Sequence, residues 1–282
     1  MPFKIYVDSR FRVDKNGADS DTDFSIELPH PLQVKGRAFV DVCLVPNTFF
    51  TIREGENDRL HVVEDVNNQP YFRIAVIAPG QYNAITLKDA LVEALNFARV
   101  IGGQYTVTYD VPTNKLHINN LDSTDTFAIY PTTWLKENAG LWNGVAPANK
   151  QINANDLRDA GAVTGFTLGA ILQQSGPQVL VKATEAVNTQ PYGQLFLRSS
   201  LGDGYSAIGP DGSSDIIRRI VMPTSLNNLT IDQHGLPHDS VPVGNNGELT
   251  SLSFRLTDVF GRTVDTNGHA ISFSIIFIHD GE

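Results

Sequence analysis

Cysteine is almost absent from this chain of 282 residues, which contains only Cys43. A single thiol excludes an intramolecular disulfide and agrees with folding in a reducing compartment. The N-terminal residues lack the long apolar run of a signal peptide. No window of the sequence approaches the roughly 18 consecutive apolar residues of a transmembrane helix. We therefore expect a soluble protein made in the cytoplasm, with no membrane insertion.

Basic residues are also scarce, with 21 Lys and Arg against 31 Asp and Glu and a formal net charge of −10. The sequence has no basic stripe that would neutralise phosphates, so we expect no binding to nucleic acid or to an anionic membrane surface. Charged residues make up 18% of the chain and hydrophobic residues 41%. This balance provides for a large core and predicts a surface that is mostly uncharged or covered by a partner.

Catalytic sequence motifs are missing as well. The chain has no G-x-S-x-G elbow, P-loop, dinucleotide fingerprint or metalloprotease helix motif. The histidines are scattered, whereas a cupin-like metal enzyme needs clustered His and Glu ligands on neighbouring strands. His234 and His238 are four residues apart, but the intervening Gly and Pro rule out an ordinary helix that would align them on zinc. We expect neither an enzyme nor a bound cofactor.

One acidic segment is a weak candidate for a metal site. Asp19, Asp21 and Asp23 have the one-three-five spacing that opens a calcium-binding loop. The glycine and the final bidentate glutamate of that loop are missing, because the chain runs directly into a predicted strand. We interpret the segment as a solvated acidic turn, and the three aspartates are only weak candidates for metal ligands.

Alternation of apolar and polar residues is the dominant pattern of the chain, and it is clearest in Leu249–Ile278. Apolar residues recur at every second position near both ends of this segment, which predicts two strands with one buried face. Asn267-Gly268 lies in the connection and supplies the two positive φ angles of a tight hairpin turn. The segment is typical of a β-sandwich or barrel.

Further strands are predicted by the same alternation, and in Arg37–Val45 it places Ala38, Val40, Val42 and Leu44 on one face, opposite Cys43. Pro29-His30-Pro31 is expected to end the second strand. The other predicted strands are Phe3–Val7, Phe24–Leu28, Arg59–Val66, Tyr71–Ile77, Tyr105–Val111, a return strand containing Leu116 and Ile118, Thr126–Tyr130, Leu195–Arg198 and Ile216–Met222.

One segment has helical instead of alternating periodicity. Leu87, Leu91 and Leu95 recur on one helical face, which predicts an amphipathic helix over Thr86–Ile101 with Thr86 as its N-cap. The stretch Asn143–Gln190 has no clear periodicity and is interpreted as an insertion, a mobile segment or a wall that orders against a neighbour.

The predicted fold is all-β: an antiparallel single jelly-roll sandwich of residues 1–282 with one amphipathic helix. The helix, a hairpin and a long loop are expected to form an insertion at residues 86–190 of this domain. Two tryptophans, Trp134 and Trp142, and the neighbouring Arg218 and Arg219 are candidate interface residues. For the two arginines we favour the alternative that they are solvated charges on an edge strand, because surface ion pairs usually contribute little.

Five ordered segments resemble the penton, or minor capsid, proteins of Maverick/Polinton elements, adintoviruses and virophages. They are FSIELPHPL, RAFVDVCLVPNTFFTI, PGQYNAITLKDALVEALN, SSDIIRRIVM and LSFRLTDVFGRTVDTNGHAISFSIIF, at residues 24–32, 37–52, 79–96, 213–222 and 252–277. The resemblance implies a single jelly roll that forms homopentamers at the five-fold vertices of an icosahedral capsid, beside a double-jelly-roll major capsid protein. It implies a location in the virion, at the capsid vertex, after synthesis in the host cytoplasm. It supplies no catalytic residue.

A closed pentamer makes two physical demands on the chain. Its head-to-tail contacts require two different, complementary surfaces on each subunit. Five copies at −10 repel one another, so we expect assembly to need salt, bound cations or basic patches on the major capsid protein. The Asp19–Asp23 loop is one place for such a cation.

An alternative interpretation is a jelly-roll module that binds a receptor or glycan, such as a spike or fibre head. This hypothesis predicts a concave aromatic patch that involves Tyr130, Trp134 or Trp142. The two hypotheses overlap if the predicted insertion faces outward and contacts a host receptor.

Overall fold

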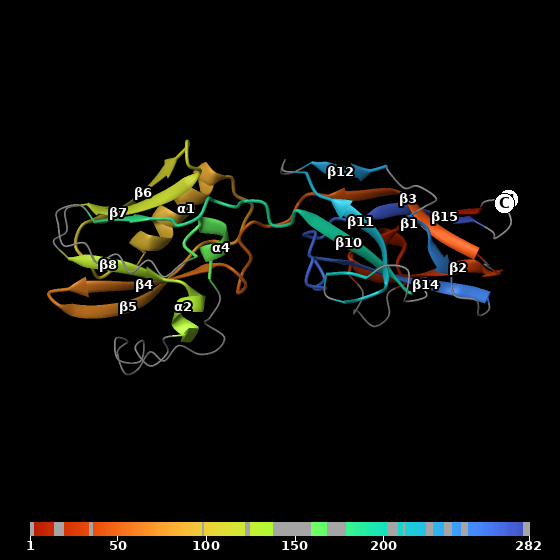
Figure 1. Ribbon diagram of the computed structural model, residues 1–282, viewed down its shortest axis with the longest axis horizontal. Helices are drawn as coiled ribbons and strands as arrows, with labels where there is room; N and C mark the ends of the chain where they lie inside the picture. The colour runs from red at the N-terminus through yellow and green to blue at the C-terminus, as the bar shows by residue number, and fades with distance from the viewer. Residues whose placement is uncertain are drawn as a thin grey trace. The chain divides into compact units, whose positions relative to one another are not determined.

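The structure, a computed structural model, divides the chain into two compact units. Unit 1 combines Met1–Phe49 with Tyr192–Glu282, and unit 2 is Phe50–Pro191. Figure 1 shows the elements of both units. The residues described are 3–13, 20–33, 36–97, 99–121, 125–137, 159–167, 179–201, 208–210, 212–223, 228–233, 239–243 and 248–278.

Unit 1 is built from two antiparallel sheets with the strand orders β1-β15-β3-β12 and β11-β10-β14-β2. A short strand, β13, also pairs with β3. A single 3-10 turn, η1 (Ser9–Phe11), follows β1. The strands are β1 (Phe3–Asp8), β2 (Asp23–Gln33), β3 (Gly36–Pro46), β10 (Gln194–Ser199), β11 (Ile216–Val221), β12 (Leu229–Asp232), β13 (Val241–Val243), β14 (Glu248–Thr257) and β15 (Ser272–Ile278).

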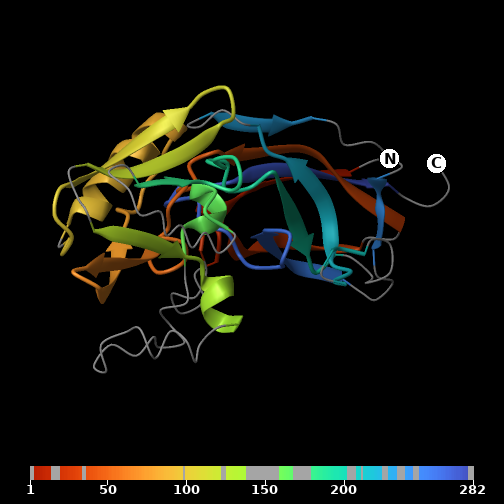
Figure 2. The ribbon, with the colours of Figure 1, turned by 60° about the vertical axis from the view of Figure 1, so that its left-hand side comes forward.

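The order of these strands confirms the predicted jelly roll. Counted along the described chain without β13, the sheets contain strands 1-8-3-6 and 5-4-7-2, which is jelly-roll topology. The first and third strands therefore flank the last one, and Figure 1 and Figure 2 show the red and orange β1 and β3 beside the blue β15. The fold class was accessible from the sequence because alternation marks most of these strands.

The core of unit 1 lies between the two sheets and is aromatic at its centre. Phe254 of β14 contacts Phe24 of β2 and Phe273 of β15, with ring centroids 5.8 and 4.8 Å apart. All three rings are buried. Edge-to-face and tilted ring pairs add about 0.5–1.5 kcal/mol each beyond the burial of their area. The alternation of β14 and β15 is thus explained by packing across the sandwich.

The predicted Asn-Gly turn is present, but the prediction that it joins two paired strands of one hairpin is wrong. Asn267 and Gly268 have φ angles of 53° and 74°, and the amide of His269 donates to the carbonyl of Thr266 at 3.3 Å. Strands β14 and β15, on either side, pair with different sheets instead of with each other. In a jelly roll this connection crosses between the sheets, so the turn shapes a crossover loop.

The prolines of β2 do not end the strand as predicted. Strand β2 continues through Pro29-His30-Pro31 to Gln33 and still pairs with β14. The register shifts at this point, where Leu249 pairs with Leu32 and Ser251 with Glu27. Because β2 is an edge strand with a bulge here, the missing proline N–H groups interrupt no central ladder.

The prediction that Ala38, Val40, Val42 and Leu44 of β3 share one face is also wrong, because the strand contains a bulge at Asp41. Ser274 pairs with Val42 while Ile275 pairs with Val40, so Asp41 is the extra residue. Beyond the bulge the inward positions shift by one, as in any register slip. Cys43 is therefore buried in the core, whereas Val42 faces away from it.

Unit 2 contains two three-stranded antiparallel sheets, β5-β4-β8 and β6-β7-β9, among its described residues, and the helix α1 (Ala84–Asn96) packs against β6 and β5. The predicted hairpin of β6 and β7 is confirmed, with Asn114 at a φ of 53° in its turn. The other elements are β4 (Arg59–Val66), β5 (Gln69–Val76), β6 (Gln104–Asp110), β7 (Lys115–Leu121), β8 (Thr126–Tyr130), α2 (Thr132–Glu137), α4 (Gly161–Thr164) and β9 (Val179–Lys182).

The helix α1 is present with different ends from those predicted. Asn83, not Thr86, is the N-cap: its side chain accepts from the amides of Ile85 and Thr86, both at 2.9 Å. The Thr86 hydroxyl accepts from the Asn83 amide in return, which completes a capping box. The helix ends at Asn96 instead of Ile101. Among the described residues, no helix is long and apolar enough to cross a bilayer.

The position of unit 2 in the chain bears on the domain organisation. Unit 2 begins at Phe50, before the expected start of the insertion at residue 86, because β4 and β5 share a sheet with β8. It follows β3 and precedes β10 of the jelly roll in sequence. That residues 86–190 form an insertion within a single jelly-roll domain stays a prediction.

Candidate functional site

Glu64 of β4 is the most buried charge among the described residues of unit 2, and it is 0% exposed. One carboxylate oxygen accepts from Nε of Arg73 and from the hydroxyl of Tyr105, both at 2.7 Å. The other oxygen accepts from the amides of Val100 at 2.7 Å and Ile101 at 3.0 Å. Burial, with Glu64 beside it, holds the pKa of Tyr105 well above its usual range.

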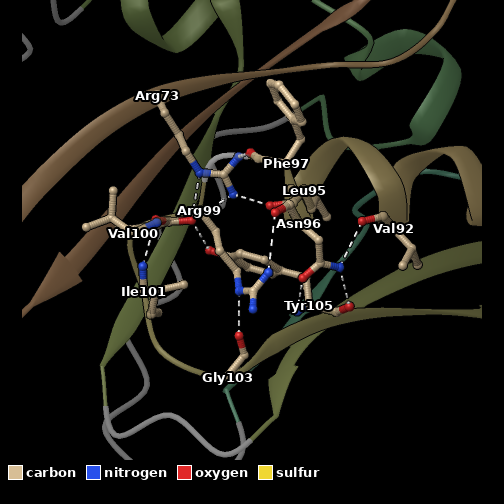
Figure 3. Close-up of polar contacts among 11 residues, drawn as sticks. Arg73, Val92, Leu95, Asn96, Phe97, Arg99, Val100, Ile101, Gly103 and Tyr105 are labelled. Atoms are coloured by element: carbon tan, nitrogen blue, oxygen red, sulfur yellow. Dashed lines mark hydrogen bonds and ion pairs between the residues drawn. The ribbon is translucent and has the colours of Figure 1, made fainter.

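Arg73 of β5 connects this carboxylate to the end of α1. Its guanidinium donates to the carbonyls of Leu95 at 2.6 Å and Phe97 at 3.4 Å, as Figure 3 shows. Leu95 lies in the last turn of α1 and Phe97 is its C-cap, where carbonyls lack helical partners. We name Glu64, Arg73 and Tyr105 the helix-anchor cluster. Its polar groups are engaged with one another and with the backbone, so it is suited to positioning the helix.

Asn96 extends this network to β6. Its side-chain amide accepts from the backbone amide of Tyr105 at 3.0 Å and donates to the Tyr105 carbonyl at 2.9 Å (Figure 3). The same amide group donates to the carbonyl of Val92 at 2.9 Å. The last turn of α1 is thus joined to both neighbouring sheets by side chains.

A second buried cation lies in unit 1. Arg198 of β10 has a side chain that is 2% exposed and donates to Thr257 Oγ1 at 2.8 Å and Asp215 Oδ1 at 2.7 Å. A shallow polar recess of about 200 Å³ lies beside it, lined by Asp23, Arg255 and neighbouring serines. Asp215 also approaches Arg255 at 3.7 Å. The acidic and basic groups of the recess balance, so it has no net charge to select an ion.

Arg218 closes one edge of the sandwich. Its guanidinium makes a bidentate pair with Asp232 of β12, with both distances 2.8 Å, and reaches Asp239 at 3.3 Å. The hydrogen bond to Asp232 raises the pKa of Arg218. Asp232 in turn lies opposite Cys43 in the sheet. Burial raises the pKa of Cys43 to about 12, and Asp232 contributes in the same direction.

The opposite edge of the sandwich is open. A groove of about 590 Å³ lies there between β1 and β2, the edge strands of the two sheets. Its lining is mainly apolar and includes Ile5, Val7, Ile26 and Leu28. Tyr6 and Phe11 also contribute to the groove, although each is 79% exposed. We call this feature the β1/β2 groove.

The predicted metal ligands are only partly covered by the structure, because Asp19 lies outside the described residues. Asp21 accepts from Arg12 at 2.8 Å, and Asp23 is exposed at the start of β2. No group of three or more His, Cys, Asp or Glu side chains in the described ranges could hold a metal ion. His234 and His238 also lie outside those ranges.

The predicted interface residues differ in their surroundings. Trp134 packs on Tyr130, with ring centroids 4.6 Å apart, and contacts a small cluster that contains Leu135. Trp142 lies outside the described residues. Arg218 has its carboxylate partners within unit 1, whereas Arg219 is exposed. The assignment of these four residues to an interface stays a prediction.

Sequence reasoning missed the helix-anchor cluster and the β1/β2 groove. The signal for the first is a glutamate on the apolar face of β4, which also carries Leu60 and Val62. A charge at a core position must have a partner, and Arg73 lies opposite Val62 on the paired strand, diagonal to Glu64 on the same face. The groove has no comparable signal in the sequence, because it lies between two strands that belong to different sheets and do not pair with each other.

Comparison with known proteins supports the fold assignment. No protein-family model and no curated protein matches this sequence. The crystal structure of the mavirus penton protein matches 99% of this chain and 99% of its own, with a TM-score of 0.50 and 6% identity. A chain of the cryo-EM structure of the Sputnik virophage matches over 98% and 97%, with a TM-score of 0.38 and 14% identity. The first match shows that this chain shares the fold of a penton protein; the second is too weak to add to that.

Proposed function

We propose that this chain is a structural protein of a viral capsid and that it forms homopentamers at the five-fold vertices. The observation that carries the proposal is the jelly-roll strand order, within a fold that matches the mavirus penton protein over nearly all of both chains. A fold alone does not define a function. The character of the buried polar sites and of the surface therefore provides separate support.

The buried charges favour a structural role. Both oxygens of Glu64 are occupied by four donors, so proton transfer at this carboxylate would first require breaking the helix-anchor cluster. A catalytic base needs an accessible lone pair within reach of a substrate proton. Burial raises the pKa of the Cys43 thiol to about 12, which suppresses the thiolate further, and the residue is 1% exposed. A nucleophile needs the opposite environment.

The surface of the chain suits an assembly with a partner of opposite charge. With a formal net charge of −10, copies in a ring repel one another. In this proposal the neighbouring double-jelly-roll major capsid protein, or bound cations, compensates that charge at the vertex of the virion. Salt screens such repulsion over a distance of about 8–10 Å at physiological ionic strength.

Size-exclusion chromatography with light scattering tests the proposal. We expect a particle of five 30.8 kDa chains, with a larger assembled fraction as NaCl rises from about 0.05 to about 0.5 M. Addition of the major capsid protein should lower the chain concentration needed for assembly. A dimer that persists at all concentrations and salt levels, with or without that partner, would contradict the proposal.

A further inference from the structure

The exposed apolar side chains of unit 1 gather at two edges of the sandwich. Six of the eight large apolar side chains that are exposed among the described residues of this unit lie on β1, η1, β11 or β12. They are Phe3, Tyr6 and Phe11 at one edge, and Val221, Leu229 and Ile231 at the other. Isolated exposed apolar residues are common, but this concentration at edges indicates contact surfaces.

The two edges lie at opposite ends of the strand order. Strands β1 and β2 each lie at one end of their own sheet, and β12 and β11 lie at the other ends of the same two sheets. The first edge carries the β1/β2 groove of about 590 Å³. At the second edge, the ion pair of Arg218 on β11 with Asp232 on β12 joins the two sheets. One edge is therefore concave and apolar, while the other is closed and projects apolar side chains.

Each edge carries one exposed charged side chain without a partner in the part of the chain that the structure describes. At the groove, Lys4 is paired with Asp41 and Arg10 with Asp8, each at 2.6 Å. Glu27, which also lines the groove, is exposed and has no partner among the described residues. Arg219 of β11 is exposed, and within the part of the chain described it too has no partner. Among the described residues, the groove edge thus has one carboxylate without a partner, that of Glu27. The other edge has one guanidinium without a partner, that of Arg219, beside the group in which Arg218 binds both Asp232 and Asp239.

We propose that the β1/β2 groove of one copy receives the β11/β12 edge of the next copy, with Glu27 facing Arg219 across the contact. This inference rests on the proposed function and names the surfaces that form its ring. Two different edges on one subunit make a head-to-tail contact, which closes into a ring when the rotation between copies permits it. The apolar side chains of both edges are then buried, and the ion pair sets the register.

Charge reversal tests the pairing directly. Glu27→Arg places two cations in the contact and Arg219→Glu places two anions there. We expect each single variant to raise the concentration at half-assembly at least about tenfold, because opposed like charges disfavour an interface. The double variant restores opposite charges and should assemble within about threefold of the wild type. Assembly is measured by native mass spectrometry of the full chain.

Two controls make the result interpretable. Glu248→Arg makes the same change of charge as Glu27→Arg, at an exposed position of β14 that does not line the groove. It should assemble like the wild type. Circular dichroism and thermal melting of every variant show whether the fold is retained, and rescue by the double variant excludes a folding defect as the cause.

Each outcome separates the inference from the proposed function. A wild-type pentamer whose single variants assemble normally overturns the inference and leaves the pentamer standing, with the groove open to a different chain. Single variants that fail without rescue in the double variant also overturn it, because the two charges are then not opposed. A wild-type chain that never forms pentamers, even with the major capsid protein, overturns the proposed function and this inference with it.

Discussion

The two units of this chain are stabilised by different chemistry. Unit 1 buries a continuous apolar layer between two sheets, and its largely buried arginines, Arg198 and Arg218, pair with carboxylates that are partly exposed. Unit 2 places Glu64 on the face that carries its apolar core, where Arg73 and Tyr105 enclose it. The first arrangement distributes stability over many contacts. The second makes the position of one helix depend on a single carboxylate.

The chain itself supplies separate probes for this comparison. Its one cysteine, Cys43, lies in unit 1, and both of its tryptophans, Trp134 and Trp142, belong to unit 2. Labelling of the buried thiol during denaturation therefore reports on unit 1, whereas tryptophan fluorescence reports on unit 2. Each unit has its own core, so we expect two separable transitions.

The largest effect is expected for Glu64→Ala. The substitution leaves Arg73 buried without its carboxylate and frees two backbone amides, which should cost unit 2 about 3–5 kcal/mol. Urea denaturation followed by tryptophan fluorescence measures this loss. Glu64→Gln, which keeps one acceptor oxygen, should lose less, and the labelling of Cys43 should hardly change. A loss below about 1 kcal/mol for Glu64→Ala would show that the helix-anchor cluster does not hold the unit together.

A smaller loss is expected in unit 1 for Arg218→Ala. The change leaves Asp232, whose side chain is 13% exposed, without its bidentate partner, at a cost of about 2–3 kcal/mol. The measurement is the urea dependence of Cys43 labelling. Arg219→Ala on the same strand removes an exposed charge and serves as the matched control, with an expected change within about 0.5 kcal/mol. Equal effects of the two substitutions would contradict the role of the Arg218 pair.

One substitution should stabilise unit 2. Asn120 of β7 is 3% exposed, and neither polar atom of its side chain has a hydrogen-bond partner among the described residues. It shares the inner face of the strand with the buried Ile118. Asn120→Val removes an unpaired buried amide and should raise the free energy of unfolding by about 1–2 kcal/mol. Chemical denaturation followed by tryptophan fluorescence tests this, and a loss of stability would refute it.

Alkaline pH should weaken unit 1 through Cys43. Burial raises its pKa in the folded state to about 12 from an ordinary value of 9.0, so only the unfolded state loses the proton between these values. The stabilisation is complete below pH 9 and declines above it, by about 1.4 kcal/mol at pH 10. Cys43→Ala lacks this dependence. The difference in stability between wild type and variant, measured by circular dichroism at pH 8 and pH 10, should shrink by that amount; a constant difference would exclude the effect.

The smallest effect concerns the N-cap of α1. Asn83→Ala removes the acceptor for two backbone amides and should lower the stability of unit 2 by about 1 kcal/mol. Asn83→Asp keeps an acceptor and should remain close to the wild type. Both values come from the tryptophan transition. If Thr86→Ala had the larger effect, Thr86 would be the dominant cap, as the sequence pattern first indicated.

The fold class was predictable because most strands keep the alternation of apolar and polar residues that is typical of a half-buried strand. Strand β4 was expected at Arg59–Val66 and has these bounds. The pairing of the strands was harder to predict. No local sequence feature at the Asn267 turn indicates that β14 and β15 belong to different sheets. The face of Cys43 could not be read either, because one extra residue at Asp41 reverses the alternation. Bulges of this kind depend on the partner strand.

The candidate site was less predictable than the fold. Glu64 and Arg73 form their pair because β4 and β5 are adjacent, and their carbonyl and amide partners come from a helix end and a loop. That Glu27 and Arg219 have no charged partner among the described residues is visible only once the ion pairs around them are known. Arg218 and Arg219 were candidate interface residues from the sequence, but the alternation of β11 alone does not show which of the two is largely buried and which is exposed.

The proposed five-membered ring is tested by electron microscopy of the chain assembled with the major capsid protein. Class averages of the isolated vertex assembly should have five-fold rotational symmetry, with one copy of this chain in each repeat. Two-fold particles or open filaments would contradict it, because the same two edges would then fail to close a five-membered ring.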